Sequence, residues 1–212
     1  MHELEITLLR HLPDTFLQAA LQSVFAARRM AWDDCRSEFA SEEAQNVRPF
    51  YARGKLEGLL RDSAERVSGA RVRVVSSEGF WNHTEISAGP VVLTAASVQT
   101  PCGLVDKSEY RMTLANSGQQ ELFPSGAPEA TQLYCLLLHS SSRWLTSQET
   151  ARFGHLPGSA FIAFPASDCD RYVHQINLFE RFPKVVEAHM PQDWDQRLRL
   201  QYLHGAKKRA AG

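Results

Sequence analysis

The stretch LEGLLRDSAERVSGARVRVV, residues 56–75, decides the fold because the spacing of its apolar residues changes at Ser68. Before Ser68, apolar side chains recur every three or four residues, the spacing of one helix face. These side chains are Leu56, Leu59, Leu60, Ala64 and Val67. After Gly69, a residue typical of a helix end, valines dominate a short run at 71–75, as in a β-strand. The stretch therefore predicts a helical part followed by a sheet part.

Upstream of this stretch, the sequence predicts two long helices. Apolar residues from Phe16 to Cys35 recur at helical spacing, and Asp14 can cap the helix that contains them. Acids just after Ser41 favour the start of a second helix, with Pro49 near its first turn. Because only a short polar stretch separates the two helices, we expect an antiparallel hairpin.

Downstream, short apolar runs separated by turn residues predict strands. They lie at 80–86, 90–98, 110–114, 133–138, 159–164 and 172–178, in addition to 71–75. The run 133–138 is continuously apolar, which is typical of a central strand buried on both faces. Residues 116–128, rich in Gly, Pro, Ser and Gln, predict a connection.

The predicted fold class is α+β in a single domain over residues 1–205. Its helical part, 1–67, forms a hairpin packed on a mixed or mostly antiparallel sheet of about six or seven strands in 70–179. A short helix at 191–205 follows, and the basic tail 206–212 is expected to be frayed.

Composition indicates a soluble globular protein without a dominant charge. Of 212 residues, 43% are apolar and 22% are charged, with a net charge of −1. No overall field draws such a chain to nucleic acid or to an anionic membrane. Its 18 arginines outnumber 5 lysines, but pairs such as Arg61-Asp62 and Glu65-Arg66 interleave them with acids, as on solvated helix faces.

We expect a cytoplasmic location, because the sequence predicts no targeting signal and its cysteines are irregularly spaced. The chain shows no signal peptide and no run of about 20 apolar residues that would span a membrane. Its four cysteines are widely and irregularly spaced and form no C-x-x-C pair, so we expect reduced thiols.

One resemblance concerns metal-assisted hydrolysis. A long helix followed by strands that carry carboxylates resembles, in outline only, the restriction-endonuclease-like nucleases. That resemblance implies one or two Mg²⁺ or Mn²⁺ ions, with Glu85 on the first strand and Asp106 and His83 as further candidates. Such nucleases carry an acid-x-Lys pair on the next strand, whereas residues 94–99 read TAASVQ, without acid or lysine. The departure predicts, at most, a degenerate version of that scaffold.

The remaining polar candidates are scattered. His83 and Glu85, two residues apart, share one face of a strand and could form an acid–base pair, a metal site or a cross-strand structural pair. His174 follows the Asp168-Cys169-Asp170 run, which offers metal ligands but is also typical of a turn.

A ligand site is best placed at the end of the run 133–138. His139 closes that run, and Arg143 and His155 lie in the long segment that follows it. Because binding residues favour strand ends and long loops, we expect any ligand here. The alternative is that these residues simply face water.

The function predicted from sequence is binding of a protein partner. No histidine and carboxylate spacing meets the needs of catalysis, so no cofactor is expected outside the nuclease alternative. We expect a cytosolic, bacterial-type module with a regulatory or defence-associated role, contacting a protein partner or another copy of itself through its hairpin and through Phe80 and Trp81. The alternatives are a metal-dependent nuclease or hydrolase, and a DNA-binding regulator that uses the N-terminal helices. Nucleic acid is less favoured because those helix faces mix charges.

Overall fold

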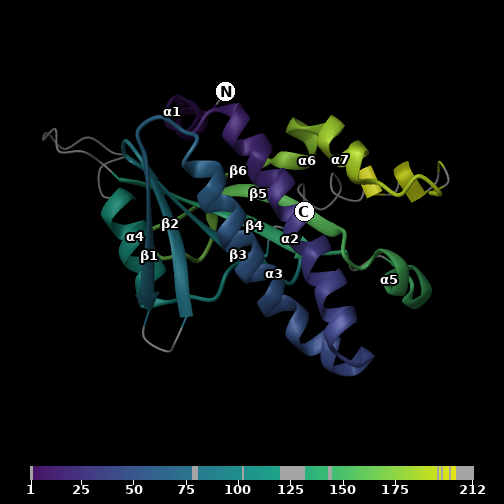
Figure 1. Ribbon diagram of the computed structural model, residues 1–212. Helices are drawn as coiled ribbons and strands as arrows, with labels where there is room; N and C mark the ends of the chain where they lie inside the picture. The colour runs from purple at the N-terminus through teal and green to yellow at the C-terminus, as the bar shows by residue number, and fades with distance from the viewer. Residues whose placement is uncertain are drawn as a thin grey trace, which may run out of the picture.

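A computed structural model describes residues 2–77, 81–101, 103–119, 132–142, 145–194, 196, 198–200 and 202–203, with backbone only at 77, 81 and 117–119. It confirms the predicted α+β class: N-terminal helices pack on a six-stranded mixed sheet, and short helices follow it (Figure 1). The helices are α1 (Glu3–His11), α2 (Asp14–Glu38), α3 (Ser41–Ala64), α4 (Glu109–Gln119), α5 (Ser147–Phe153), α6 (Leu178–Arg181) and α7 (Pro183–His189). The strands are β1 (Ala70–Ser77), β2 (Trp81–Ala88), β3 (Val91–Val98), β4 (Leu133–Ser141), β5 (Pro157–Pro165) and β6 (Tyr172–Asn177).

The sheet keeps its strands in chain order, β1 to β6. Neighbouring strands are antiparallel except β3 and β4, which are parallel. A parallel pair requires a crossover connection, and α4 lies in that connection. β2 and β3 pair only next to their turn, Ile86–Ala88 with Val91–Leu93. Over the described remainder of the two strands no pairing joins them, and the sheet opens there.

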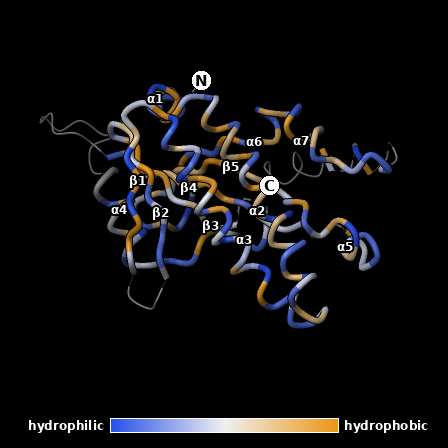
Figure 2. Tube along the Cα trace, in the orientation of Figure 1, coloured by the Kyte–Doolittle hydropathy of each residue, from blue (hydrophilic) through white to orange (hydrophobic). Residues whose placement is uncertain are grey.

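The central strand β4 is buried on both faces, as its continuous apolar run predicts. Alternate residues Leu133, Cys135 and Leu137 belong to the core under α1, α2 and α3. Those between them, such as Leu136 and Leu138, belong to the core under α4. Figure 2 shows the apolar chain of β4 and β5 running through the middle of the molecule. The hairpin thus covers one face and α4 the other.

The predicted helical hairpin is present. Tyr51 donates a hydrogen bond of 2.8 Å to Glu38, and Lys55 pairs with Asp34 at 2.9 Å. These contacts show that α3 runs back along α2. None of the described helices is both long and apolar enough to cross a bilayer.

Three sequence predictions are wrong in detail. Residues 110–114 form the start of α4 rather than a strand, because five alternating residues fit either structure and the parallel β3–β4 pair needs a crossover. Pro49 lies inside α3, which already begins at Ser41. The strand predicted over 172–178 ends at Asn177, because the Asn177 side chain accepts hydrogen bonds from the Phe179 and Glu180 amides and so starts α6.

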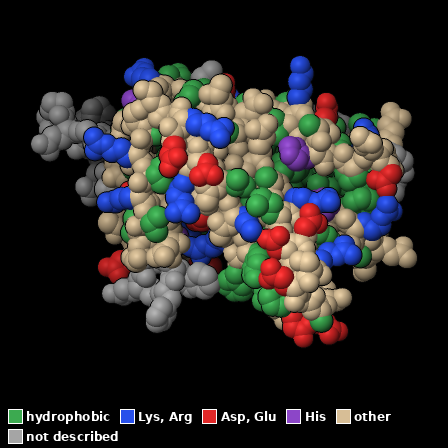
Figure 3. Space-filling model, viewed as in Figure 1, with side chains coloured by type: hydrophobic (Ala, Val, Ile, Leu, Met, Phe, Trp, Pro, Cys, Tyr) green, Lys and Arg blue, Asp and Glu red, His purple; other side chains and the backbone are tan. Residues whose placement is uncertain are grey.

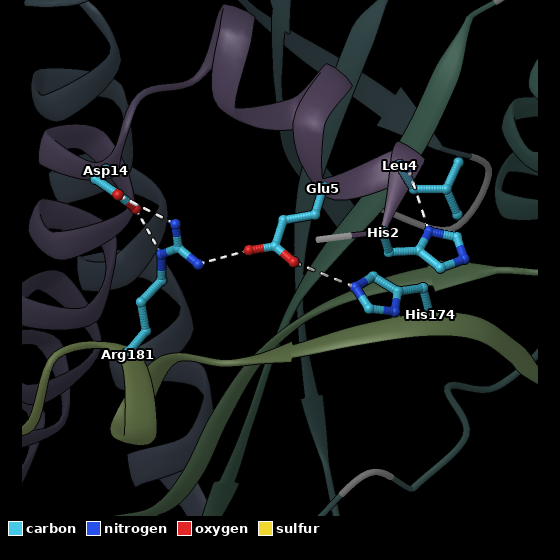
Figure 4. Close-up of polar contacts among 6 residues, drawn as sticks. All are labelled: His2, Leu4, Glu5, Asp14, His174 and Arg181. Carbon is cyan, nitrogen blue, oxygen red and sulfur yellow. Dashed lines mark hydrogen bonds and ion pairs between the residues drawn. The ribbon is translucent and has the colours of Figure 1, made fainter.

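An ion-pair network joins α1 to the neighbouring elements α2, α6 and β6 (Figure 4). Arg181 of α6 donates to Glu5 at 2.6 Å and to Asp14 at 2.5 Å. Glu5 also lies 3.7 Å from His174 Nε2, and the ring of His174 stacks on that of His2 with centroids 4.3 Å apart. The network joins α1, α2, α6 and β6, and it explains the position of His174 without a ligand.

Candidate functional site

A cleft of about 890 Å³ lies between the helical hairpin and the segment that follows β4. A smaller hollow of about 250 Å³ adjoins it, and Pro49, Ser97 and His139 line both. We call the two together the arginine cleft. Its charged lining side chains are Arg28, Arg36 and Arg48 in the larger hollow and Arg53, Arg111 and Glu57 in the smaller one.

The charge of this cleft differs from that of the rest of the surface. Figure 3 shows Lys and Arg side chains interspersed with Asp and Glu on the hairpin face, where Arg29, for example, pairs with Asp33 at 2.8 Å. Within the described residues, Arg28, Arg36 and Arg48 form no ion pair with a carboxylate. A chain of net charge −1 therefore contains a concave region whose described lining has five arginines and one glutamate.

Arg28 of α2 reaches across the cleft and holds its opposite wall. Its Nε donates to the His155 carbonyl at 3.3 Å, and its Nη2 donates to Ser141 Oγ at 3.0 Å and to the Gly154 carbonyl at 3.5 Å. Burial lowers the pKa of Arg28 to about 10, so the guanidinium remains charged at neutral pH. It contributes a cation that has neutral partners and no counter-ion among the described side chains.

Arg48 and Arg36 lie over the indole of Trp32. The Arg48 guanidinium carbon is 4.0 Å from the ring centroid and that of Arg36 is 5.8 Å away, within cation–π range. Gly154 permits the close approach of the opposite wall, since an added Cβ there would lie 2.8 Å from the Trp32 ring. Burial also lowers the pKa of Arg48. Stacking thus holds two arginines in place while their N–H groups can serve a ligand.

His139 and His155, both expected near a ligand, lie in this cleft. His139 is buried, and its pKa is lowered to about 3, mainly by burial and to a lesser extent by repulsion from Arg28. Burial and Arg29 lower the pKa of His155 to about 4, so both rings are neutral at pH 7. Arg143, predicted with them, lies outside the described residues.

Three buried nitrogens around the cleft have no hydrogen-bond partner within the described part of the chain. They are Nδ1 of His139, Nδ1 of His155 and Nε of Arg48. Leaving a buried polar group unsatisfied costs about 1–3 kcal/mol, and most buried polar atoms in proteins are satisfied. Other such atoms, for example Nδ2 of Asn177, lie elsewhere in the described chain, so these three nitrogens are polar groups at the cleft rather than a mark unique to it.

In the smaller hollow, His83 holds the side chain of Arg53 in place. Arg53 Nη2 contacts His83 Nδ1 at 3.0 Å and donates to the Asn82 carbonyl at 3.0 Å. A guanidinium only donates, so Nδ1 of neutral His83 accepts and its proton lies on Nε2. Burial, with repulsion from Arg53, lowers the pKa of His83. This arrangement leaves the ring no lone pair with which to act as a base.

Among the described residues that line the cleft, Glu57 is the only one with a carboxylate. Its Oε2 accepts the Thr84 amide at 2.7 Å, which fixes the carboxyl against β2 where β2 and β3 separate. Burial raises its pKa.

Glu85 lies outside the cleft lining, and both of its oxygens have protein partners. Oε1 accepts from Arg73 Nε at 2.8 Å, and Oε2 accepts from the Tyr110 hydroxyl at 2.9 Å. Across the described residues, no group of three or more His, Cys, Asp and Glu side chains is placed to hold a metal ion. Asp106 contributes its backbone carbonyl to Arg111 at 2.7 Å. His83 and Glu85 both contact Tyr110, whose ring stacks on that of His83 with centroids 5.5 Å apart, but the candidates do not form a metal site.

The predicted contact edge is described only in part. Phe80 lies outside the described residues, and Trp81 begins β2 with its side chain not described. In contrast, the cleft arginines were not expected from the sequence. Arg28, Trp32 and Arg36 are four residues apart along α2, which puts them on one helix face, and this spacing is the signal that identifies them.

Comparisons with protein-family models, with curated proteins and with solved structures find no match to this chain.

Proposed function

We propose that this chain binds a phosphate-bearing ligand in the arginine cleft. The observation that carries the proposal is the larger hollow, which Arg28, Arg36 and Arg48 line with no Asp or Glu among its described lining residues. A guanidinium fork matches the geometry of phosphate oxygens and keeps its charge at any physiological pH. Partial burial strengthens such attraction, since water screens it less.

The uncharged lining supports the same ligand chemistry. Ser97, Ser141, Ser147 and Thr150 line the larger hollow, and their hydroxyls can donate to phosphate oxygens. Neutral His139 adds a ring nitrogen, Nδ1, for which the described part of the chain supplies no hydrogen-bond partner. Multiple N–H and O–H donors around one hollow suit a ligand with many acceptor oxygens.

The earlier functional expectations keep the status of predictions. Binding of a protein partner through the hairpin, and a regulatory or defence-associated role, rest on the sequence argument alone. The nuclease alternative gains no support from Glu85, whose oxygens are occupied by Arg73 and Tyr110.

Calorimetric titration with pyrophosphate and with ATP tests the proposal. We expect binding that weakens between about 50 and 200 mM salt, because salt screens ion pairing to phosphates. Arg36→Gln and Arg48→Gln should each weaken it by about tenfold, which corresponds to about 1.4 kcal/mol and lies near the value of one charge-assisted hydrogen bond.

The matched control is Arg66→Gln, because Arg66 is exposed just after the C-terminal end of α3 and does not line the cleft. It should bind like the unaltered chain. Absence of binding to both phosphate compounds, or equal affinities in cleft and control variants, would contradict the proposal.

A further inference from the structure

We infer that the phosphate-bearing ligand is a single-stranded nucleic acid, an inference that rests on the proposed function and names its substrate class. Three features of the arginine cleft carry it: its length, the depth of its cations and an exposed aromatic ring that lines its smaller hollow.

The length of the cleft exceeds the reach of one nucleotide. Along α3, lining residues extend from Ser41 in the larger hollow to Glu57 in the smaller one. At a rise of 1.5 Å per residue, sixteen steps span roughly 24 Å. Arg48 and Arg53 lie along this line and face different hollows. A polymer with a phosphate at every unit can contact both hollows, whereas a mononucleotide occupies one.

The depth of the cationic groups favours a flexible strand over a duplex. Arg28 and Arg48 are half-buried. A single strand can lower individual phosphates into the hollow, as in positively charged grooves that track a nucleic-acid backbone. A rigid duplex would meet only the rim.

Phe50 provides an aromatic surface at the smaller hollow. Its side chain is 54% exposed and lines the smaller hollow, next to Pro49, which lines both. Aromatic rings beside a positive groove stack bases without strong sequence preference. The smaller hollow also has apolar walls from Leu56 and Ala95. Its volume of about 250 Å³ is just below that of pockets for drug-sized molecules, which suits one base.

Fluorescence anisotropy with a labelled 12-nucleotide single strand of mixed sequence, as RNA and as DNA, tests the inference. We expect at least tenfold tighter binding than to the duplex of the same sequence, to ATP, or to a poly-glutamate peptide of equal charge. Phe50→Ala should weaken single-strand binding by about five- to a hundredfold, the range for losing the stacking of one base. Pyrophosphate binding should not change.

The controls separate stacking from folding. Phe50→Tyr keeps an aromatic ring and should bind like the unaltered chain. Ile6→Ala removes an apolar side chain that is also exposed, at 44%, but lies on α1 outside the cleft, and it should have no effect. Circular dichroism and the thermal midpoint verify that each variant is folded.

The outcomes distinguish this inference from the proposed function. Equal affinity for duplex, for ATP or for poly-glutamate, or single-strand binding unaffected by Phe50→Ala, overturns the inference while pyrophosphate binding upholds the proposed function. Loss of binding to every phosphate compound overturns both.

Discussion

Removing the hydroxyl of Tyr110 tests whether Glu85 has a structural role. The Glu85 side chain is 4% exposed, and its Oε2 accepts from the Tyr110 hydroxyl at 2.9 Å. A hydrogen bond to an ionised acceptor contributes about 1.5–3 kcal/mol. Tyr110→Phe leaves one buried oxygen without this donor, so we expect it to lower the free energy of unfolding by about 2 kcal/mol.

Urea titration followed by circular dichroism measures this change, and a double-mutant cycle isolates the pair. In a Glu85→Gln background the hydroxyl faces a neutral amide, so Tyr110→Phe should cost only about 0.5–1.5 kcal/mol. The difference, about 1 kcal/mol, is the coupling energy of the two side chains. A cost below about 0.5 kcal/mol in the unaltered background, or the same cost in both backgrounds, would refute the structural role, since that is the scatter between uncoupled sites.

Pro49, Gly158 and His139 offer further tests. Proline inside α3 lacks the N–H that would bond to the Gln45 carbonyl, so Pro49→Ala should raise the free energy of unfolding in urea by about 1–3 kcal/mol. A Cβ on Gly158 would lie 2.3 Å from the Ser141 carbonyl oxygen, so Gly158→Ala should lower the free energy of unfolding by about 1–3 kcal/mol. An unchanged urea midpoint would show that β4 and β5 can shift to make room. Burial lowers the pKa of His139 to about 3, whereas the unfolded chain protonates near pH 6.5. The contribution of neutral His139 to the free energy of unfolding is therefore complete above about pH 6.5. Between about pH 6.5 and pH 3 it falls by up to about 1.4 kcal/mol per pH unit. His139→Gln should therefore remove nearly one proton from the slope of unfolding free energy against pH.

The fold was largely predictable because its periodic segments are long and its central strand is unusual. The run 133–138 is apolar at every position, and only a strand with cores on both sides requires that. Residues 110–114 were misassigned because the evidence for helix lies elsewhere, in the parallel β3–β4 pair that α4 must connect. Strand order, unlike spacing, is not a local property of the sequence.

The site was predictable only in part, for a related reason. His139 and His155 were expected near a ligand because they lie at a strand end and in a long connection. Arginines interleaved with acids were expected on solvated faces, and Arg61 and Arg66 are indeed exposed. Arg28 differs from these exposed arginines because it contacts a segment more than 110 residues away in sequence. This tertiary contact makes part of the α2 face a wall of the cleft.

This tertiary origin also connects the stability of the cleft with its proposed use. Arg28 and Arg48 are partly buried by the packing of α2 and α3 against the chain after β4. This burial is the largest cause of their lowered pKa values. Mutual repulsion between the two acts in the same direction for Arg28. An anion in the cleft compensates both effects at once, so it stabilises the folded chain by the free energy of its binding. Partial burial makes the charged form of these arginines energetically unfavourable when no anion is bound. The same burial makes their attraction for phosphate stronger than that of exposed arginines on the hairpin face, because water screens it less.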